Sequence, residues 1–342
     1  MVTLGVYVQG GLGDHLIQLN VVRMFLEHLR TLYISEDIST DFILGQHSSL
    51  DFLRMVPFID NVLVDVELEK ELSLGGGDYL KSVTHSYDIF VILKYVGKII
   101  ASGEYSFLSS DQDPVWCSQW RDHFESHPNC CIQLAELGHL KDVMAASLGI
   151  LSSNIDMQLL IPIELQDYRV ATCLPIPYIV IASGTDTQLQ SPKLTKSIPR
   201  STLVAVTMNL FTLGYTVVEV GARGTPSLDI PGTLDLIGQT TIPELVPILL
   251  GAHSLLLVEG GLAHLAACVN KSATVLFGPT DPNFLAYPLH TNMVTKRECH
   301  PCYFSTPDWY LFCPARLDAV CMRDFSVGSI VESLVLPGGG SL

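Results

Sequence analysis

The first thirty residues constrain the fold more than any other part of the chain. Residues 2–8 form a run of mostly branched apolar residues, which is typical of a buried strand. The run leads into Gly10-Gly11-Leu12-Gly13-Asp14, after which apolar residues recur at helical spacing as far as Leu29. Strand, glycine turn and helix in this order predict the start of a nucleotide-type α/β unit. In such a unit the glycines allow close backbone approach and the helix N-terminus favours an anion.

The rest of the chain continues the alternation of strands and helices, and it does so twice. In the first half, strands are predicted at residues 40–44, 61–66 and 88–93, with a helical segment at 49–55. In the second half, strands are predicted at 178–182, 215–220, 254–258 and 273–277, and helices at 199–213, 241–250 and through His264 to 269. This pattern predicts parallel sheets covered by helices in both halves.

A proline-containing stretch separates the two halves. Residues 159–177 lose the periodicity and contain Pro162, Pro175 and Pro177, which is typical of a linker. We therefore expect two domains, residues 1–160 and 161–342, as the length of 342 residues also suggests. Two doubly wound α/β domains are expected to face a central cleft lined by the carboxyl ends of their strands.

Charge and hydropathy exclude several classes of function. The chain has 35 acidic and 19 basic residues and a formal charge of −16, which disfavours nucleic acid as a partner. Its apolar runs are far shorter than the roughly 20 residues of a membrane-spanning helix, so any membrane association is expected to be peripheral. The N-terminus lacks the basic region of a signal peptide, and we expect a cytoplasmic protein.

Three segments carry residues that could bind or transform a ligand. Asp14 either caps a helix that begins at His15 or serves as a functional carboxylate. The turn from Glu259 through Gly260 and Gly261 to His264 offers backbone N–H groups to a phosphate, although a histidine there can also be purely structural. The loop from Ser183 to Ser197 contains Gly184, Thr185, Lys193 and Lys196; these groups suit an anion, while solvated surface lysines are the alternative.

The glycine spacing argues against one familiar class of enzyme. It does not match G-x-G-x-x-G, and Glu36 or Asp37 is only loosely placed for the acidic residue that would bind ribose after the second strand. A nicotinamide-dependent oxidoreductase is therefore disfavoured.

Taken together, the order of these motifs resembles the ADP-heptose glycosyltransferases, glycosyltransferase family 9. The resemblance covers about residues 2–330. It rests on six segments: Gly10-Gly-Leu-Gly-Asp14, Pro57-Phe-Ile-Asp-Asn-Val62, the loop that ends in Lys196-Ser-Ile-Pro199, Gly238-Gln-Thr-Thr-Ile-Pro-Glu244, Glu259-Gly-Gly-Leu-Ala-His264 and Phe277-Gly-Pro-Thr-Asp281.

The resemblance implies a GT-B fold, with the acceptor on the N-terminal domain and the sugar nucleotide mainly on the C-terminal domain. Asp14 matches the family's catalytic base and Lys196 its phosphate-contacting lysine. Glu259 replaces the family's usual aspartate, and Ile198 stands where tryptophan is common. The implied donor-binding residues are Gly13, Ser183, Gly184, Thr185, Lys196, Glu219, Glu259, Gly260, Gly261 and His264.

The implied activity is inverting transfer of a heptose from ADP-heptose to an acceptor hydroxyl. No metal-binding D-x-D sequence accompanies the donor segments, so we expect catalysis without a divalent cation. The acceptor would be a sugar of the lipopolysaccharide core or a protein serine. The alternative is a non-catalytic protein of the same fold that binds a sugar nucleotide or acts as a scaffold.

Four of the nine cysteines lie in one short segment near the C-terminus: Cys299, Cys302, Cys313 and Cys321. Four thiolates within one stretch suit tetrahedral zinc or iron, while reduced structural thiols or two disulfides are the alternatives. The segment resembles the four-cysteine finger of the autotransporter heptosyltransferase branch, which implies structural iron. The sequence leaves the oligomeric state open, and a homo-oligomer is compatible with it.

Overall fold

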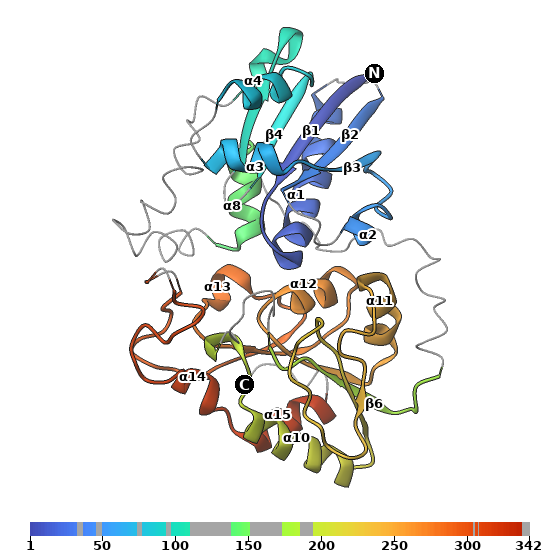
Figure 1. The fold of residues 1–342 in the computed structure, drawn as a ribbon, viewed down its shortest axis with the longest axis vertical. Helices are drawn as coiled ribbons and strands as arrows, with labels where there is room; N and C mark the ends of the chain where they lie inside the picture. The colour runs from blue at the N-terminus through green and yellow to red at the C-terminus, as the bar shows by residue number, and fades with distance from the viewer. Residues whose placement is uncertain are drawn as a thin grey trace. The chain divides into compact units, whose positions relative to one another are not determined.

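A computed structural model describes residues 1–32, 37–45, 50–73, 77–93, 97–109, 138–150, 173–184, 194–303, 305–306 and 308–336. The chain divides into two compact units, Met1–Pro162 and Ile163–Leu342, each with its own sheet (Figure 1). The predicted linker at residues 159–177 lies largely outside the described residues, as do Thr185 and Lys193.

The first unit is built on a five-stranded sheet with the order β3-β2-β1-β4-β5. Four of its strands are parallel, and β5 runs antiparallel to β4, so the prediction of a purely parallel sheet is wrong at this edge. The strands are β1 (Val2–Val8), β2 (Ile38–Leu44), β3 (Asn61–Val64), β4 (Ile89–Leu93) and β5 (Gly97–Ala101). The helices are α1 (Leu12–Thr31), α2 (Leu50–Leu53), α3 (Val66–Ser73), α4 (Asp78–Thr84), η1 (Gly103–Leu108) and α8 (Leu140–Ser147).

Burial explains why these residues form a sheet with helices on its faces. All five residues of β4 and five consecutive residues of β1 are buried, as expected for strands covered on both sides. Tyr7, Ile43 and Phe90 pack with Leu68 and Leu72 of α3. Helices α1 and α8 pack against each other behind the sheet in Figure 1.

The second unit is built on a six-stranded, fully parallel sheet with the order β11-β10-β9-β6-β7-β8. The strands are β6 (Tyr178–Ile181), β7 (Thr216–Glu219), β8 (Leu234–Asp235), β9 (Ser254–Val258), β10 (Thr274–Phe277) and β11 (Thr291–Val294). The helices are η3 (Leu194–Lys196), α10 (Arg200–Thr212), α11 (Ile242–Gly251), α12 (Gly261–Cys268), α13 (Pro282–Leu285), α14 (Val320–Arg323) and α15 (Val327–Val335).

Two layers of helices cover this second sheet. The strand residues Ile179, Val217 and Leu256 belong to one buried apolar cluster. Val206 of α10 and Ile330 of α15 complete the same cluster from the helical layer. Helices α11 and α12 lie on the other side of the sheet (Figure 1). None of the helices in the described part of the chain has the length and apolar character needed to cross a bilayer.

Local signals in the sequence explain two helix boundaries. The predicted helix at 241–250 begins with a capping box: the Thr241 N–H donates to Glu244 Oε2 at 2.7 Å, and the Thr241 hydroxyl accepts from the Glu244 N–H. Helix α10 ends at Thr212, just before Gly214 with a φ of 84°, as predicted.

Candidate functional site

A buried carboxylate stands at the carboxyl end of the second sheet. Glu259 follows β9 directly and precedes α12, and its N–H donates to the Leu276 carbonyl on β10. The residue is only 3% exposed. A charge placed this deep requires partners, because removing a carboxylate from water costs several kcal/mol.

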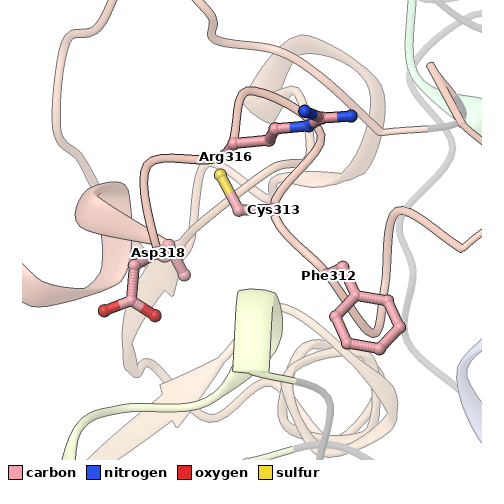
Figure 2. A pocket seen from close by; sticks show the side chains of 5 residues that line it. Phe312, Cys313, Arg316 and Asp318 are labelled. Atoms are coloured by element: carbon pink, nitrogen blue, oxygen red, sulfur yellow. The ribbon is translucent and has the colours of Figure 1, made fainter.

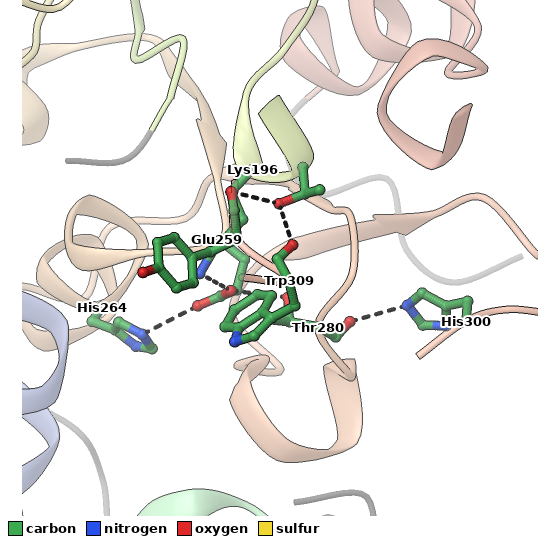
Figure 3. A network of polar contacts seen from close by, with 8 residues as sticks. Lys196, Glu259, His264, Thr280, His300 and Trp309 are labelled. Carbon is green, nitrogen blue, oxygen red and sulfur yellow. Dashed lines mark hydrogen bonds and ion pairs between the residues drawn. The ribbon is translucent and has the colours of Figure 1, made fainter. Parts of the chain in front are cut away.

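Three side chains from three separate segments meet the Glu259 carboxylate (Figure 3). Lys196 Nζ lies 2.5 Å from Oε2, and the Thr280 hydroxyl donates to the same oxygen at 2.9 Å. His264 Nε2 lies 3.7 Å from Oε1. The structure therefore brings together Lys196, Glu259 and His264, which the sequence placed in one donor-binding group.

These neighbours keep Glu259 ionised. Burial by itself raises the pKa of the carboxyl, but the ammonium of Lys196 and the ring of His264 more than offset it and hold the pKa well below its usual range. The pair is thus a buried salt bridge with an additional hydroxyl donor. The Lys196 side chain is 14% exposed, against 4% for that of Glu259, so the lysine is the more accessible member of the pair.

A tyrosine orients the ring of His264. His264 Nδ1 lies 2.6 Å from the Tyr287 hydroxyl, and the two rings meet edge to face. Burial, with smaller effects from Cys268 and Glu259, raises the pKa of Tyr287 well above its ordinary value, so the phenol keeps its proton. With Nε2–H facing the carboxylate, Nδ1 accepts the phenol proton, which fixes the tautomer.

The loop after β6 lies beside Lys196. Ile198 N–H donates to the Ser183 carbonyl at 2.8 Å, and Gly184 forms an isolated antiparallel bridge with Ser197. Ser183 and Gly184 are therefore adjacent to the lysine, as the predicted donor loop requires. Thr185, the third predicted residue of this loop, lies outside the described residues.

Glu219 ends the neighbouring strand β7 and is 3% exposed. Its Oε2 accepts the Leu228 N–H at 2.8 Å. Its Oε1 is buried and has no hydrogen-bond partner among the described residues. One carboxylate oxygen is thus left with acceptor capacity at the same edge of the sheet as Glu259.

In the first unit, Asp14 takes part in a helix cap, but not in the predicted position. Helix α1 begins at Leu12 with Gly11 as N-cap, so the expectation of a helix beginning at His15 and capped by Asp14 is wrong. Asp14 instead lies in the first turn, where its Oδ2 accepts the Gly11 N–H at 2.9 Å. Gly10 has a φ of 128°, and a Cβ there would collide with Asp14, so the glycine is required for this turn.

The residues around Asp14 form a partly exposed turn over a buried helix face. Asp14 and Gly13 are partly exposed, whereas His15 is 1% exposed. Burial lowers the pKa of His15 to about 4, against a smaller opposing effect of Asp14, so the imidazole is neutral at physiological pH. Asp14 therefore stands as the accessible charged group of the turn.

The four predicted metal-binding cysteines are free thiols in neighbouring positions of the second unit. Burial raises the pKa of Cys302 to about 12, with further contributions from Cys299, Cys321 and Cys313. The thiols thus lie close enough to influence one another. Among the described residues, however, no group of three or more His, Cys, Asp or Glu side chains is arranged to hold a metal ion.

A strained loop and a small cavity accompany these thiols. Between Cys313 and Cys321, the non-glycine residues Arg316, Asp318 and Ala319 all have φ near 50° in the left-handed region. Such residues cost about 1–3 kcal/mol each and persist only where the surroundings fix them. Figure 2 shows the adjoining cavity of about 250 Å³, lined by Phe312, Cys313, Arg316, Asp318 and Ala319.

Comparison with known proteins connects this site to a family. A model of glycosyltransferase family 9 (heptosyltransferase) matches residues 218–306, which include Glu219, Glu259 and His264. Over residues 218–306 the chain is therefore similar to glycosyltransferase family 9. This match confirms the predicted resemblance to that family for these residues. No protein of curated function matches the chain in sequence.

Solved structures of two heptosyltransferases and of a family 9 glycosyltransferase share the fold over 98% of this chain. ADP-heptose lipopolysaccharide heptosyltransferase II of E. coli is 15% identical, with 98% of each chain covered and a TM-score of 0.62. A family 9 glycosyltransferase of Veillonella parvula is 14% identical, with 98% and 97% covered and a TM-score of 0.59. The dodecameric iron-containing heptosyltransferase TibC of enterotoxigenic E. coli, solved with ADP-D-β-D-heptose, is 15% identical, with 98% of this chain and 75% of that chain covered and a TM-score of 0.60. These likenesses confirm the predicted GT-B fold class.

Sequence reasoning missed several residues that build the site around Glu259. Tyr287 and Trp309 were not predicted to contact His264 or Lys196, and no local pattern around them signals these long-range contacts. Thr280 lies inside the recognised Phe277–Asp281 motif, yet no role was assigned to its hydroxyl. The motif follows strand β10, which pairs with strand β9, and Glu259 follows β9. This neighbouring position could have indicated that Thr280 lies near Glu259.

We predict that Lys196→Met destabilises the protein by about 3–5 kcal/mol, because it leaves Glu259 buried without its cation. Combining it with Glu259→Gln removes the buried charge and should restore most of the loss. Unfolding in urea measures both. The matched control is Lys70→Met, which breaks an exposed ion pair with Glu67 and should cost less than about 1 kcal/mol.

The same pair has a pH dependence of defined sign. Because the folded pKa of Glu259 is lowered, the stability it contributes is present above the usual value of 4.5 and is lost as the pH falls below it. As the pH falls through that range, the wild type should lose stability relative to the double variant, which lacks the ionised Glu259. A Lys196→Met variant as stable as Lys70→Met would show that the pair is not the buried salt bridge described above.

Proposed function

We propose that this protein is a glycosyltransferase that transfers a heptose from an ADP-linked donor to an acceptor hydroxyl, with inversion and without a divalent cation at the reacting centre. The observation that carries the proposal is the coincidence of the family match with the Lys196–Glu259–His264 group at the carboxyl edge of a parallel sheet. In doubly wound folds this edge is where nucleotides bind. The structural neighbour TibC, solved with ADP-D-β-D-heptose, supports the choice of donor.

In the proposed complex the second unit binds the donor. Lys196 and the first-turn N–H groups of α12, at Gly261, face the diphosphate, because a helix N-terminus and an ammonium both favour negative charge. Gly260, Ser183, Gly184 and Thr185 supply the remaining loop around it. The free Oε1 of Glu219 accepts a hydroxyl or amino hydrogen of the nucleoside.

The chemistry of the proposed step follows from these groups. Asp14 takes the proton of the acceptor hydroxyl as its oxygen attacks the anomeric carbon of the heptose. The bond from that carbon to the phosphate oxygen breaks, and ADP leaves with the bonding electrons. Lys196 and the α12 N-terminus stabilise the charge that develops on the diphosphate. Gly13, beside the base in α1, is proposed to contact the donor.

The character of the donor site supports a reaction without divalent cations. Mg²⁺ is held by carboxylates together with substrate phosphates. Here the carboxylate of Glu259 is already committed to Lys196, Thr280 and His264. The positive charge that a cation would supply comes from the lysine and the helix N-terminus.

A non-catalytic protein of the same fold is the alternative. It is favoured by one observation, the hydrogen bond from Gly11 to Asp14, which gives that carboxylate a purely structural task. Partial exposure of Asp14 and its place on the glycine turn favour the catalytic role. Turnover measurements separate the two.

We also propose that the thiols of Cys299, Cys302, Cys313 and Cys321 hold a structural iron or zinc ion. Four sulfur donors suit either metal, and the left-handed residues between Cys313 and Cys321 need a constraint that holds them. The iron in the structural neighbour TibC supports iron. This ion would stabilise the segment and take no part in the transfer.

We predict that the protein converts ADP-heptose and an acceptor into ADP and a product heavier by one heptosyl group. Mass spectrometry of lipopolysaccharide core acceptors and of serine-containing protein acceptors identifies the acceptor class. EDTA should leave the initial rate unchanged. Absence of transfer and of ADP release with every acceptor, despite ADP binding, would favour the non-catalytic alternative.

We predict that Asp14→Asn lowers turnover by about 10²- to 10⁴-fold, because it removes the general base. Its amide oxygen can still accept the Gly11 N–H, so the helix cap and the affinity for ADP should persist. The matched control is Asp78→Asn, an exposed acid in the first turn of α4, which should keep full activity. Wild-type turnover by Asp14→Asn would remove Asp14 from the mechanism.

We predict about one iron or zinc ion per chain in protein purified without chelators, measured by elemental analysis. Cys302→Ser should lower the metal content severely and reduce thermal stability. Cys173→Ser, at an exposed cysteine outside the segment, should change neither. Metal-free wild-type protein of unchanged stability would refute the metal proposal.

A further inference from the structure

A tryptophan from the four-cysteine segment lies against the donor-site lysine. The ring centroid of Trp309 is 5.9 Å from Lys196 Nζ, and Figure 3 shows the indole beside the Lys196–Glu259 pair. The tryptophan is 8% exposed. An ammonium within about 6 Å of a tryptophan face is attracted by the ring, and the attraction grows as water is excluded.

The backbone of the same segment holds the residue before the lysine. The Thr195 hydroxyl lies 3.1 Å from the Trp309 carbonyl and 2.9 Å from the Tyr310 carbonyl. Thr195 is itself buried. Two successive residues of η3 are therefore fixed by two successive residues of the four-cysteine segment, one through a hydroxyl and one through an aromatic ring.

Neighbouring aromatic rings hold the indole in place. Tyr303 meets Trp309 at a centroid distance of 6.2 Å and Tyr310 meets it at 5.9 Å, both edge to face. The Trp309 N–H of the backbone donates to the Thr306 carbonyl. The ring is therefore a rigid surface, not a side chain that must be ordered when a ligand binds.

A ring and a carboxylate act differently on the same ammonium. Glu259 accepts a hydrogen bond from one N–H of the Lys196 ammonium. The indole ring attracts the positive charge without accepting a conventional hydrogen bond. An ammonium has three N–H groups. The indole thus steadies the lysine and leaves N–H directions for oxygens of an incoming anion.

We propose that Trp309 is a positioning residue for donor binding, which holds the Lys196 ammonium where it meets the diphosphate of the nucleotide. This inference rests on the proposed function, because it takes the donor to be a nucleoside diphosphate sugar. It also gives the four-cysteine segment a second task besides its own folding, since Trp309 lies between Cys302 and Cys313.

The test compares ADP with adenosine, which lacks the phosphates. Calorimetry on the full chain measures ADP affinity directly and adenosine affinity by competition. Trp309→Leu should weaken ADP binding about 3- to 10-fold and change adenosine binding less than about twofold. Trp309→Phe, which keeps a ring, should give an intermediate ADP affinity. The matched control Phe312→Leu, at a 61% exposed aromatic of the same segment, should bind both like wild type.

Two results would overturn the inference while the proposed function stands: ADP affinity unchanged in Trp309→Leu, or ADP and adenosine weakened equally, which indicates a purely structural role. Wild-type protein that binds neither ADP nor ADP-heptose would overturn the proposed function and this inference with it.

A double-mutant cycle in the absence of nucleotide tests the contact itself. Trp309→Leu is compared in the wild type and in Lys196→Met/Glu259→Gln, where no unpaired charge remains. Trp309→Leu is expected to change the unfolding equilibrium constant about threefold more in the wild type than in the double variant. An equal effect in both backgrounds would contradict the contact between Trp309 and Lys196.

Discussion

The burial of one charge organises the candidate donor site. Glu259 cannot lose its solvation without compensation, and the compensation comes from residues far apart in sequence: Lys196 before α10, His264 in α12 and Thr280 after β10. Because each partner must reach the same carboxylate, the loop after β6, the turn into α12 and the turn after β10 are fixed relative to one another. The carboxylate thus determines where the groups that face a phosphate can lie.

This arrangement changes what the lysine can offer an anion. An isolated Lys196 would be a mobile positive charge, whereas the paired lysine is preorganised but partly neutralised. The Glu259 carboxylate lies 2.5 Å from Nζ, so much of the lysine's charge is balanced within the protein. The lysine side chain remains the more exposed member of the pair, which favours contact of an approaching diphosphate with the lysine over contact with the carboxylate. Additional attraction must come from the N-terminus of α12, which carries no compensating charge of its own.

The sequence predicted those features that depend on neighbouring residues. Branched apolar runs marked β1, β2, β6 and β9, helical spacing marked α1, and the Thr241–Glu244 pair marked the start of α11, because each signal is local. Strand β5 was missed because its Gly97–Ala101 segment begins with glycine and lysine and is only partly buried, so it lacks a continuous apolar run. The alternative in which Asp14 caps a helix beginning at His15 placed the helix start too late, since α1 begins at Leu12. The glycines before it can adopt several backbone conformations, so the sequence does not fix where the helix starts. The roles of Tyr287 and Trp309 arise from contacts across 23 and 113 positions, which no local pattern records.

The turn after β10 joins the carboxylate to the four-cysteine segment. The Pro279 carbonyl accepts the N–H groups of Cys302 and Tyr303, and His300 Nε2 lies 3.0 Å from the Thr280 carbonyl. Thr280 in turn donates its hydroxyl to Glu259. At Gly278 a Cβ would collide with the Thr195 carbonyl and with Met322, so only glycine lets the turn pack this closely. Disorder in the four-cysteine segment would therefore loosen Thr280 and Thr195 together. Thr280 donates to Glu259, and Thr195 directly precedes Lys196. The four-cysteine segment and the candidate donor site are therefore expected to become ordered or disordered together.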